Sequence, residues 1–115
     1  MGNRKIPPDL QTLIPVADAI AAAVGPYCEV VLHDISRPEQ SVVHIAGNVT
    51  NRSVGAPLTD MVLHRLRTQG DAIADLLGYH NVTKEGKTLR SSTTFVRDGQ
   101  GKVIGCLCVN IDQTP

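Results

Sequence analysis

Two long runs near the C-terminal end constrain the fold of this chain most strongly. Residues 89–97 and 102–112 are both rich in β-branched and apolar side chains, and Asp98-Gly-Gln-Gly101 separates them. This pattern predicts an antiparallel β-hairpin with a tight turn. An antiparallel strand with one face exposed to solvent should alternate apolar and polar residues, and neither run shows a regular alternation. We therefore expect a sheet that is covered on both faces.

Length and composition limit the class of protein. The chain has 115 residues, enough for one domain with its own core, and 42% hydrophobic with 19% charged residues is typical of a soluble globular protein. Eleven basic residues balance eleven acidic ones, and there is no Trp. These features argue against direct nucleic-acid binding by this domain, which would favour a basic surplus and stacking aromatics. No run resembles a signal peptide or a membrane span, so we expect a cytoplasmic protein without membrane contact.

The order of predicted elements indicates an α+β domain. We expect a flexible leader over residues 1–8 and a single domain over 9–115. The domain should hold one antiparallel sheet, with short helices on one face and the N-terminal helix or a second subunit on the other. The predicted elements are a helix over 9–24, strands over 28–34 and 42–46, a helix from Pro57, a shorter helix over 71–77 closed by Gly78, a loop or short strand over 79–86, and the long hairpin.

Several separated motifs carry a family resemblance. They are Cys-Glu-Val-Val-Leu-His-Asp at 28–34, Asn48 with residues 52–55 and 57–60, and residues 89–94 with 105–110. Over residues 10–112 the chain resembles the YheO-like PAS domain, the N-terminal sensor half of bacterial transcriptional regulators of the D-arginine utilisation repressor type. The resemblance implies a PAS-like fold whose five-stranded antiparallel sheet and short helices enclose a small-molecule cavity. It also implies a C-terminal helix-turn-helix domain, which this sequence, ending at Pro115, does not contain.

The register of the hairpin decides which residues share a face. A turn centred on Gly99-Gln100 pairs Thr93 with Cys106 and Arg97 with Lys102, and a slip of one residue would change the faces. One predicted face holds Ser91, Thr93, Phe95, Ile104, Cys106, Cys108 and Asn110, and the other holds Ser92, Thr94, Val96, Val103, Gly105, Leu107 and Val109.

The first of these faces has the composition of a ligand cavity, because hydroxyls, an aromatic ring and an amide stand among small apolar groups. The predicted ligand-binding residues are His33, Ser91, Thr93, Phe95, Cys108 and Asn110. Asn110 is the sharpest candidate, since its amide both donates and accepts hydrogen bonds. Its alternative role is a structural bond to loop backbone.

The sequence predicts no metal site, no cofactor and no catalytic residue. Cys28, Cys106 and Cys108 include no Cys-x-x-Cys pair, so we expect small buried thiols, with a metal or redox role as the lesser alternative. The four histidines show no metal-ligand spacing. A small hydrolase or isomerase using His33 and Asp34 would need both side chains in one pocket, whereas neighbours in a strand point to opposite faces.

The functional hypothesis is a regulatory sensor. The domain would bind a small polar effector, such as an amino acid, and signal through a homodimer to an attached DNA-binding domain by population shift. The alternative is a structural dimerisation module whose cavity is filled by its own side chains.

Overall fold

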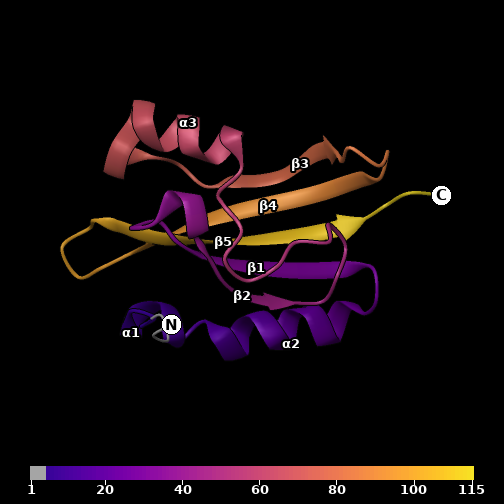
Figure 1. Cartoon of the computed structure of the whole chain (residues 1–115), viewed down its shortest axis with the longest axis horizontal. Helices are drawn as coiled ribbons and strands as arrows, with labels where there is room; N and C mark the ends of the chain where they lie inside the picture. The colour runs from indigo at the N-terminus through magenta and orange to yellow at the C-terminus, as the bar shows by residue number, and fades with distance from the viewer. Residues whose placement is uncertain (1–4) are drawn as a thin grey trace.

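The fold is a five-stranded antiparallel sheet with helices on both faces (Figure 1). The structure, a computed structural model, describes residues 5–115, so the first four residues of the predicted leader lie outside it. The elements are α1 (Pro8–Gln11), α2 (Ile14–Val24), β1 (Cys28–Asp34), η1 (Pro38–Gln40), β2 (Val42–Ala46), α3 (Asp60–Gln69), η2 (Gly70–Ala72), β3 (Leu76–Val82), β4 (Thr88–Arg97) and β5 (Val103–Asp112). The strand order is β2-β1-β5-β4-β3, with α2 along β1 and β2 on one face and α3 on the other. The predicted α+β class is confirmed, and among the described residues no helix is long and apolar enough to cross a membrane.

The N-terminal helix forms in two pieces. The sequence predicts one helix over 9–24, but α1 ends at Gln11 and α2 begins at Ile14. Pro15 explains the break, because it has no N–H to continue the helical ladder and is tolerated in the first turn of a new helix. Gly25, with φ of 103°, ends α2 as predicted.

The first hairpin forms over the predicted residues, whereas the middle of the chain differs from the prediction. The helix expected from Pro57 begins at Asp60, where the Thr59 hydroxyl accepts a bond from the Val62 N–H at 3.4 Å. The predicted helix over 71–77 is wrong, because one 3-10 turn leads instead into β3. Asp71 caps no helix; its carboxylate accepts the backbone N–H of Val103 at 2.9 Å and so ties the turn to β5.

The long hairpin is confirmed, with a register that differs from the predicted one by two residues. Thr93 pairs with Cys108 and Phe95 with Cys106. A shift of two keeps each side chain on its predicted face. A bulge opposite Val96 and Arg97 changes the end of β5, so Val103 belongs to the core on the α3 side and Ile104 packs on the α2 side, the reverse of the prediction.

Both faces of the sheet are buried, as predicted from the lack of a regular apolar–polar alternation in the hairpin strands. The core between α2 and the sheet includes Leu10, Ala17, Cys28, Val30, Leu32, Val43 and Leu107. The core on the α3 side includes Val31, Val42, Leu58, Val62, Ile73, Phe95, Val103, Cys106 and Cys108. At Gly105 a Cβ atom would lie 2.3 Å from the His33 carbonyl oxygen and 2.7 Å from Leu10, so only glycine allows α1 to approach the sheet this closely.

Candidate functional site

Three cross-strand rows make up the α3-side face of the central strands. Their members come from β1, β5 and β4 in that order, and residues paired directly across antiparallel strands share a face. The polar row is Glu29, Asn110 and Ser91; the middle row is Val31, Cys108 and Thr93; the inner row is His33, Cys106 and Phe95. This face therefore changes from polar to sulfur-rich and aromatic along the strands.

The polar row is a continuous hydrogen-bond network. The Ser91 hydroxyl donates to Asn110 Oδ1 at 2.7 Å, and Asn110 Nδ2 donates to Glu29 Oε2 at 3.1 Å. Both ends of the Asn110 amide are thus engaged by side chains of strands β4 and β1, and not by the loop backbone that its structural alternative named. The amide keeps a second N–H and a second lone pair, which leaves capacity for a ligand.

Glu29 connects this network to the loop after β2. Its carboxylate is fully buried and accepts the backbone N–H groups of Val49 and Thr50, each at 3.0 Å. The Thr50 hydroxyl adds a bond to Oε2 at 2.8 Å. A buried carboxylate needs such donors to offset its lost hydration. Glu29 thereby holds the loop against the sheet at one end of the face.

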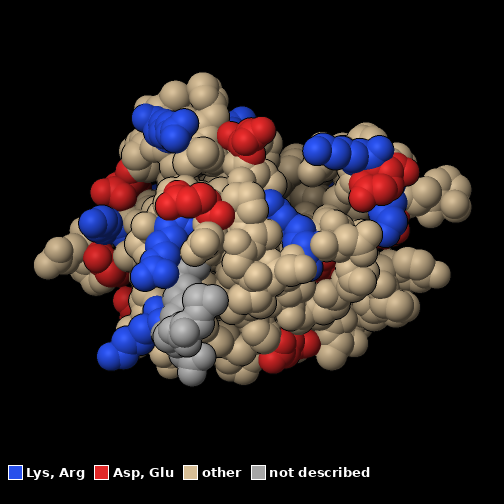
Figure 2. Space-filling view, in the orientation of Figure 1, with Lys and Arg blue, Asp and Glu red and all other residues tan. Residues whose placement is uncertain are grey.

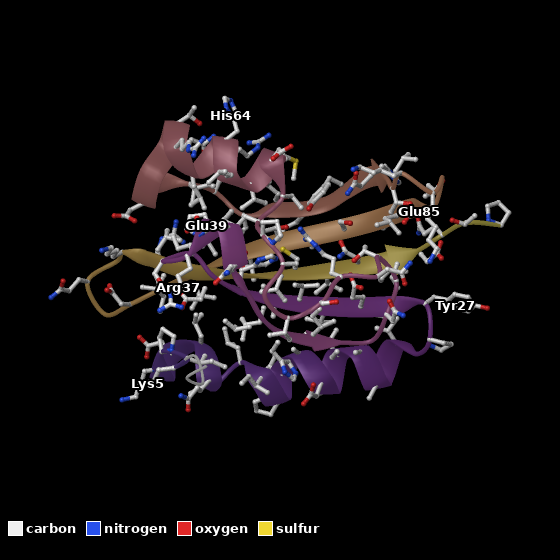
Figure 3. The ribbon with its side chains drawn as sticks, in the orientation of Figure 1. Lys5, Tyr27, Arg37, Glu39, His64 and Glu85 are labelled. Atoms are coloured by element: carbon white, nitrogen blue, oxygen red, sulfur yellow. The ribbon has the colours of Figure 1, made fainter. Side chains whose placement is uncertain are left out.

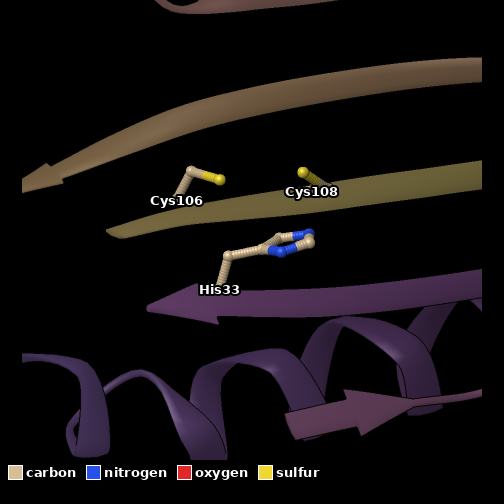
Figure 4. A group of neighbouring side chains, drawn as sticks. All are labelled: His33, Cys106 and Cys108. Atoms are coloured by element: carbon tan, nitrogen blue, oxygen red, sulfur yellow. The ribbon is translucent and has the colours of Figure 1, made fainter. Parts of the chain in front are cut away.

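His33, Cys106 and Cys108 form a buried cluster in the inner and middle rows, which we call the His–Cys cluster. Their ligand-type atoms all lie within 4.8 Å of one another. Figure 4 shows the two sulfur atoms directed toward each other above the imidazole ring, with one ring nitrogen turned toward Cys108. The other nitrogen, Nδ1, lies 2.7 Å from the Ser41 hydroxyl.

The two clustered thiols differ in acidity. The pKa of Cys108 is lowered well below its ordinary value, mainly because Cys106 donates a hydrogen bond to its sulfur, and bonds from His33 and Thr93 add to the effect against the cost of burial. The pKa of Cys106 is raised well above its ordinary value by that same bond and by burial. Cys108 is therefore the more acidic of the two thiols. Thr93 Oγ1 donates to Cys108 Sγ at 3.3 Å.

A pocket of about 580 Å³ lies over the polar and middle rows, between the start of α3 and the β3–β4 turn. The surface is hollowed here in Figure 2, which also shows basic and acidic residues interspersed over this face. In Figure 3, His64 on α3 points away from the sheet, whereas Glu85 stands at the β3–β4 turn on the rim of the pocket. The lining residues are Thr50, Arg52, Thr59, Met61, Val62, Tyr79, His80, Asn81, Val82, Thr83, Lys84, Glu85, Leu89, Cys108 and Asn110.

Two of the six predicted ligand-binding residues line this pocket, namely Cys108 and Asn110. The other four share the same face but lie behind or beside the lining. Ser91 binds Asn110, Thr93 binds Cys108, His33 belongs to the His–Cys cluster, and Phe95 packs into the α3-side core.

The sequence reasoning missed three residues that matter here. Arg52 and Tyr79 line the pocket, and Tyr79 Oη lies 3.0 Å from the Thr93 hydroxyl. Burial raises the Tyr79 pKa, so the phenol stays neutral near pH 7. Arg52 stands within a family-like motif, which was an available signal. Cys106 was placed on the right face, but its proximity to His33 required the pairing of β1 with β5.

His33 and Asp34 do not converge on one site. His33 pairs with Cys106 on the pocket side, whereas Asp34 pairs with Gly105 on the opposite side. Asp34 Oδ1 accepts bonds from the backbone N–H and the hydroxyl of Ser36, at 3.0 and 2.8 Å. This geometry removes the arrangement on which the hydrolase or isomerase hypothesis depends.

Comparison with solved structures supports the fold assignment. The chain superposes on an RNA-binding light-oxygen-voltage receptor with a TM-score of 0.54 and 16% sequence identity, over 95% of this chain and 35% of that one. At this identity the likeness concerns the fold alone.

Comparison with curated sequences identifies closer relatives. The chain is 33% identical to the uncharacterised protein YheO of Escherichia coli K12 over 105 residues, and 37% identical to an uncharacterised Haemophilus influenzae protein over 99 residues. It is 35% identical to the transcriptional regulator DauR of Pseudomonas aeruginosa over 108 residues. These alignments cover 84–91% of this chain but 44–48% of the relatives, so the chain spans about half their length. Residues 4–115 match the YheO-like PAS domain, and the chain belongs to that family.

Proposed function

We propose that this domain is the cytoplasmic sensor of a transcriptional regulator and that a small polar metabolite binds in the α3-side pocket. The observation that carries the proposal is the position of the pocket, which is walled by α3 and the β3–β4 turn and floored by Cys108 and Asn110 of the central strand. A ligand there contacts both the sheet and the segments around it. Relationship to a transcriptional regulator supports the sensor role.

The charges on the pocket favour a zwitterionic ligand such as an amino acid. Arg52 and Lys84 bring positive charge to the lining, and Glu85 brings negative charge. Arg52 uses one N–H to donate to the Pro57 carbonyl oxygen at 2.7 Å, and its guanidinium retains further donors for a carboxylate. Hydroxyl and amide groups on the remaining wall suit the polar part of a side chain.

A thermal-shift screen with amino acids and organic acids, followed by calorimetric titration, tests the proposal. A ligand that binds only the folded state at 100 times its Kd stabilises it by about 2.7 kcal/mol. We expect Arg52→Gln to weaken binding about tenfold or more, since it removes a charge-assisted contact. Arg67→Gln, on the exposed part of α3, is the matched control and should leave binding unchanged.

The two outcomes separate the sensor from the structural module. A shift that Arg52→Gln removes and Arg67→Gln retains supports the sensor. If no compound in the panel shifts the melting temperature or gives heat on titration, the sensor proposal fails and the dimerisation module is favoured.

The solvent side of α2 supports the dimer on which signalling would depend. Val16 and Val24 are exposed there, and the alanines at 19, 22 and 23 are exposed beside them. Small and β-branched side chains at helical spacing form a flat apolar stripe that a second copy of α2 fits. The acidic residue of α2, Asp18, is already bound to His44 at 2.7 Å.

Sedimentation at micromolar concentration tests the dimer. We expect the wild-type chain to sediment as a dimer and Ala19→Glu to sediment as a monomer with an unchanged melting temperature in dilute solution. Gln69→Glu, at the exposed end of α3, is the control and should remain dimeric. A monomeric wild-type chain would overturn this part of the proposal.

A further inference from the structure

The His–Cys cluster brings together three ligand types that bind the same kind of metal ion. His33 comes from β1, and Cys106 and Cys108 come from β5, so the pairing of these strands creates the cluster. Their ligand atoms lie within 4.8 Å of one another and all three residues are buried. Two thiolate ligands bound at 2.3 Å with tetrahedral angles stand about 3.8 Å apart. Small side-chain rotations therefore close the cluster around an ion.

The donor set selects for a particular class of cation. Two sulfur atoms and one imidazole nitrogen favour thiophilic d¹⁰ ions, zinc(II) or copper(I), over magnesium or calcium, which prefer oxygen. Three protein ligands suit trigonal copper(I), or zinc with a fourth position open. Cys108 also lines the α3-side pocket, so the pocket provides an entry path and room for a fourth ligand.

Neighbouring hydroxyls support the cluster as the outer shell of a metal site does. The Ser41 side chain, itself fully buried, lies 2.7 Å from His33 Nδ1, which leaves Nε2 to face the sulfur atoms. Thr93 donates to Cys108 Sγ and lies 3.0 Å from the Tyr79 hydroxyl. Such contacts orient an imidazole ligand and stabilise a thiolate.

We propose that His33, Cys106 and Cys108 form a binding site for one thiophilic d¹⁰ cation per chain. The site lies beside the α3-side pocket, and metal binding does not depend on a metabolite in that pocket. On loading, the ion forms bonds to Sγ of Cys106, Sγ of Cys108 and Nε2 of His33. Both cysteines bind as thiolates and His33 binds through a deprotonated Nε2, with its remaining proton on Nδ1 toward Ser41; the protons that the two sulfur atoms and Nε2 carried before loading are released to solvent. No electron is transferred, and a divalent ion is neutralised by the two thiolates.

Cobalt(II), a spectroscopic substitute for zinc, provides the first test with the reduced full chain. Thiolate ligation to cobalt gives a sulfur-to-metal charge-transfer absorption that oxygen and nitrogen ligation do not. We expect this absorption to saturate at one equivalent and to disappear when zinc is added. Native mass spectrometry should show one zinc per chain. Competition with a copper(I)-specific chelator measures the affinity of the site for copper(I). Comparison with the zinc affinity then decides which ion the site binds more tightly.

Three cysteine variants provide matched comparisons. Cys106→Ser and Cys108→Ser should lose the charge-transfer absorption and weaken zinc binding by more than about tenfold. Cys28→Ser, a change of the same kind on the opposite face, should retain both. Ser41→Ala should keep the absorption but weaken binding about tenfold, because it removes the partner of His33.

Several results would overturn the site. They are the absence of both cobalt charge-transfer absorption and copper(I) binding in the wild-type chain, absorption retained in both Cys106→Ser and Cys108→Ser, or loss confined to Cys28→Ser. The wild-type measurements need no variant, so they decide the matter even if a serine variant fails to fold.

Discussion

The two faces of the sheet both carry a buried core but are chemically different. On the α2 side the central residues are aliphatic, for example Val30 and Leu32, and they pack directly on the helix. On the α3 side, the same strands carry Glu29, Asn110 and His33, each engaged in hydrogen bonds. Burying polar groups costs free energy unless they are satisfied, and on the α3 side each of these groups has a hydrogen-bond partner that offsets the cost. One face is therefore packed mainly with aliphatic side chains, whereas the other combines an apolar core with a hydrogen-bonded polar network.

The cysteines show the same contrast within one residue type. Cys28 lies on the α2 side, where burial and then the neighbouring Glu29 charge raise its pKa. Cys108 lies on the α3 side, where hydrogen bonds led by that from Cys106 lower its pKa despite burial. Burial alone keeps a thiol protonated, whereas donors arranged around the sulfur favour the thiolate.

Leu32→Ala should have the largest effect of the changes considered. Leu32 is fully buried in the α2-side core, and Leu→Ala at such sites costs about 2–5 kcal/mol, because apolar contacts are lost and a cavity remains. Urea unfolding followed by circular dichroism measures the loss. Metal affinity at temperatures where the variant is folded should stay within about twofold of the wild-type value. A loss below about 1 kcal/mol would show that Leu32 does not contribute the packing energy expected of a fully buried leucine.

Glu29→Gln tests the polar row and should cost less, about 1–3 kcal/mol. The glutamine amide can present its oxygen to the Val49 and Thr50 N–H groups, but its NH₂ then faces the Asn110 NH₂, so donor meets donor. Equilibrium unfolding measures the cost, and hydrogen exchange at residues 49 and 50 should accelerate. Glu39→Gln, an exposed change of the same kind, is the control and should be within about 0.5 kcal/mol of wild type. Equal effects of the two changes would show that the network adds no stability.

Ser91→Ala should cost about 1 kcal/mol, since it removes the donor to Asn110 Oδ1 within a buried pair. Asn110→Ala in the Ser91→Ala background completes a double-mutant cycle. We expect a coupling energy of at least about 0.5 kcal/mol between the two positions, because they are in direct contact. Additive losses would mean that the bond makes no net contribution to folding.

The sequence predicted the helices and strands far better than it predicted which residues from different strands lie close together. The hairpin strands, the first hairpin and the doubly covered sheet follow from local composition and turn residues. The residues after Asp71 became a strand instead of a helix because Asp71 and Asp75 bind backbone N–H groups of β5 and β4, partners distant in the sequence. The His–Cys cluster depends on the register of β1 against β5, which no local pattern specifies. Clusters of side chains that come from different strands were therefore the part of the structure that the sequence alone could not predict.

The smallest expected effect concerns pH and separates Cys28 from the α3-side thiols. The pKa of Cys28 is raised in the folded chain. Its contribution to the free energy of unfolding is therefore fully present below the unfolded thiol pKa of about 8.5, and it is lost as pH rises through the folded pKa. In that window the unfolded chain releases a proton that the folded chain keeps. Wild-type stability should therefore fall relative to Cys28→Ala between roughly pH 8 and 10, by at most about 1.4 kcal/mol per pH unit, since one thiol can release at most one proton. Urea unfolding of both proteins across this range measures the difference.

Tyr79→Phe serves as the control, because Tyr79 also has a raised pKa but lies on the other face. If the difference between wild type and Cys28→Ala stays constant with pH while the Tyr79→Phe difference changes, then the alkaline sensitivity arises on the α3 side and the raised pKa of Cys28 does not contribute to it.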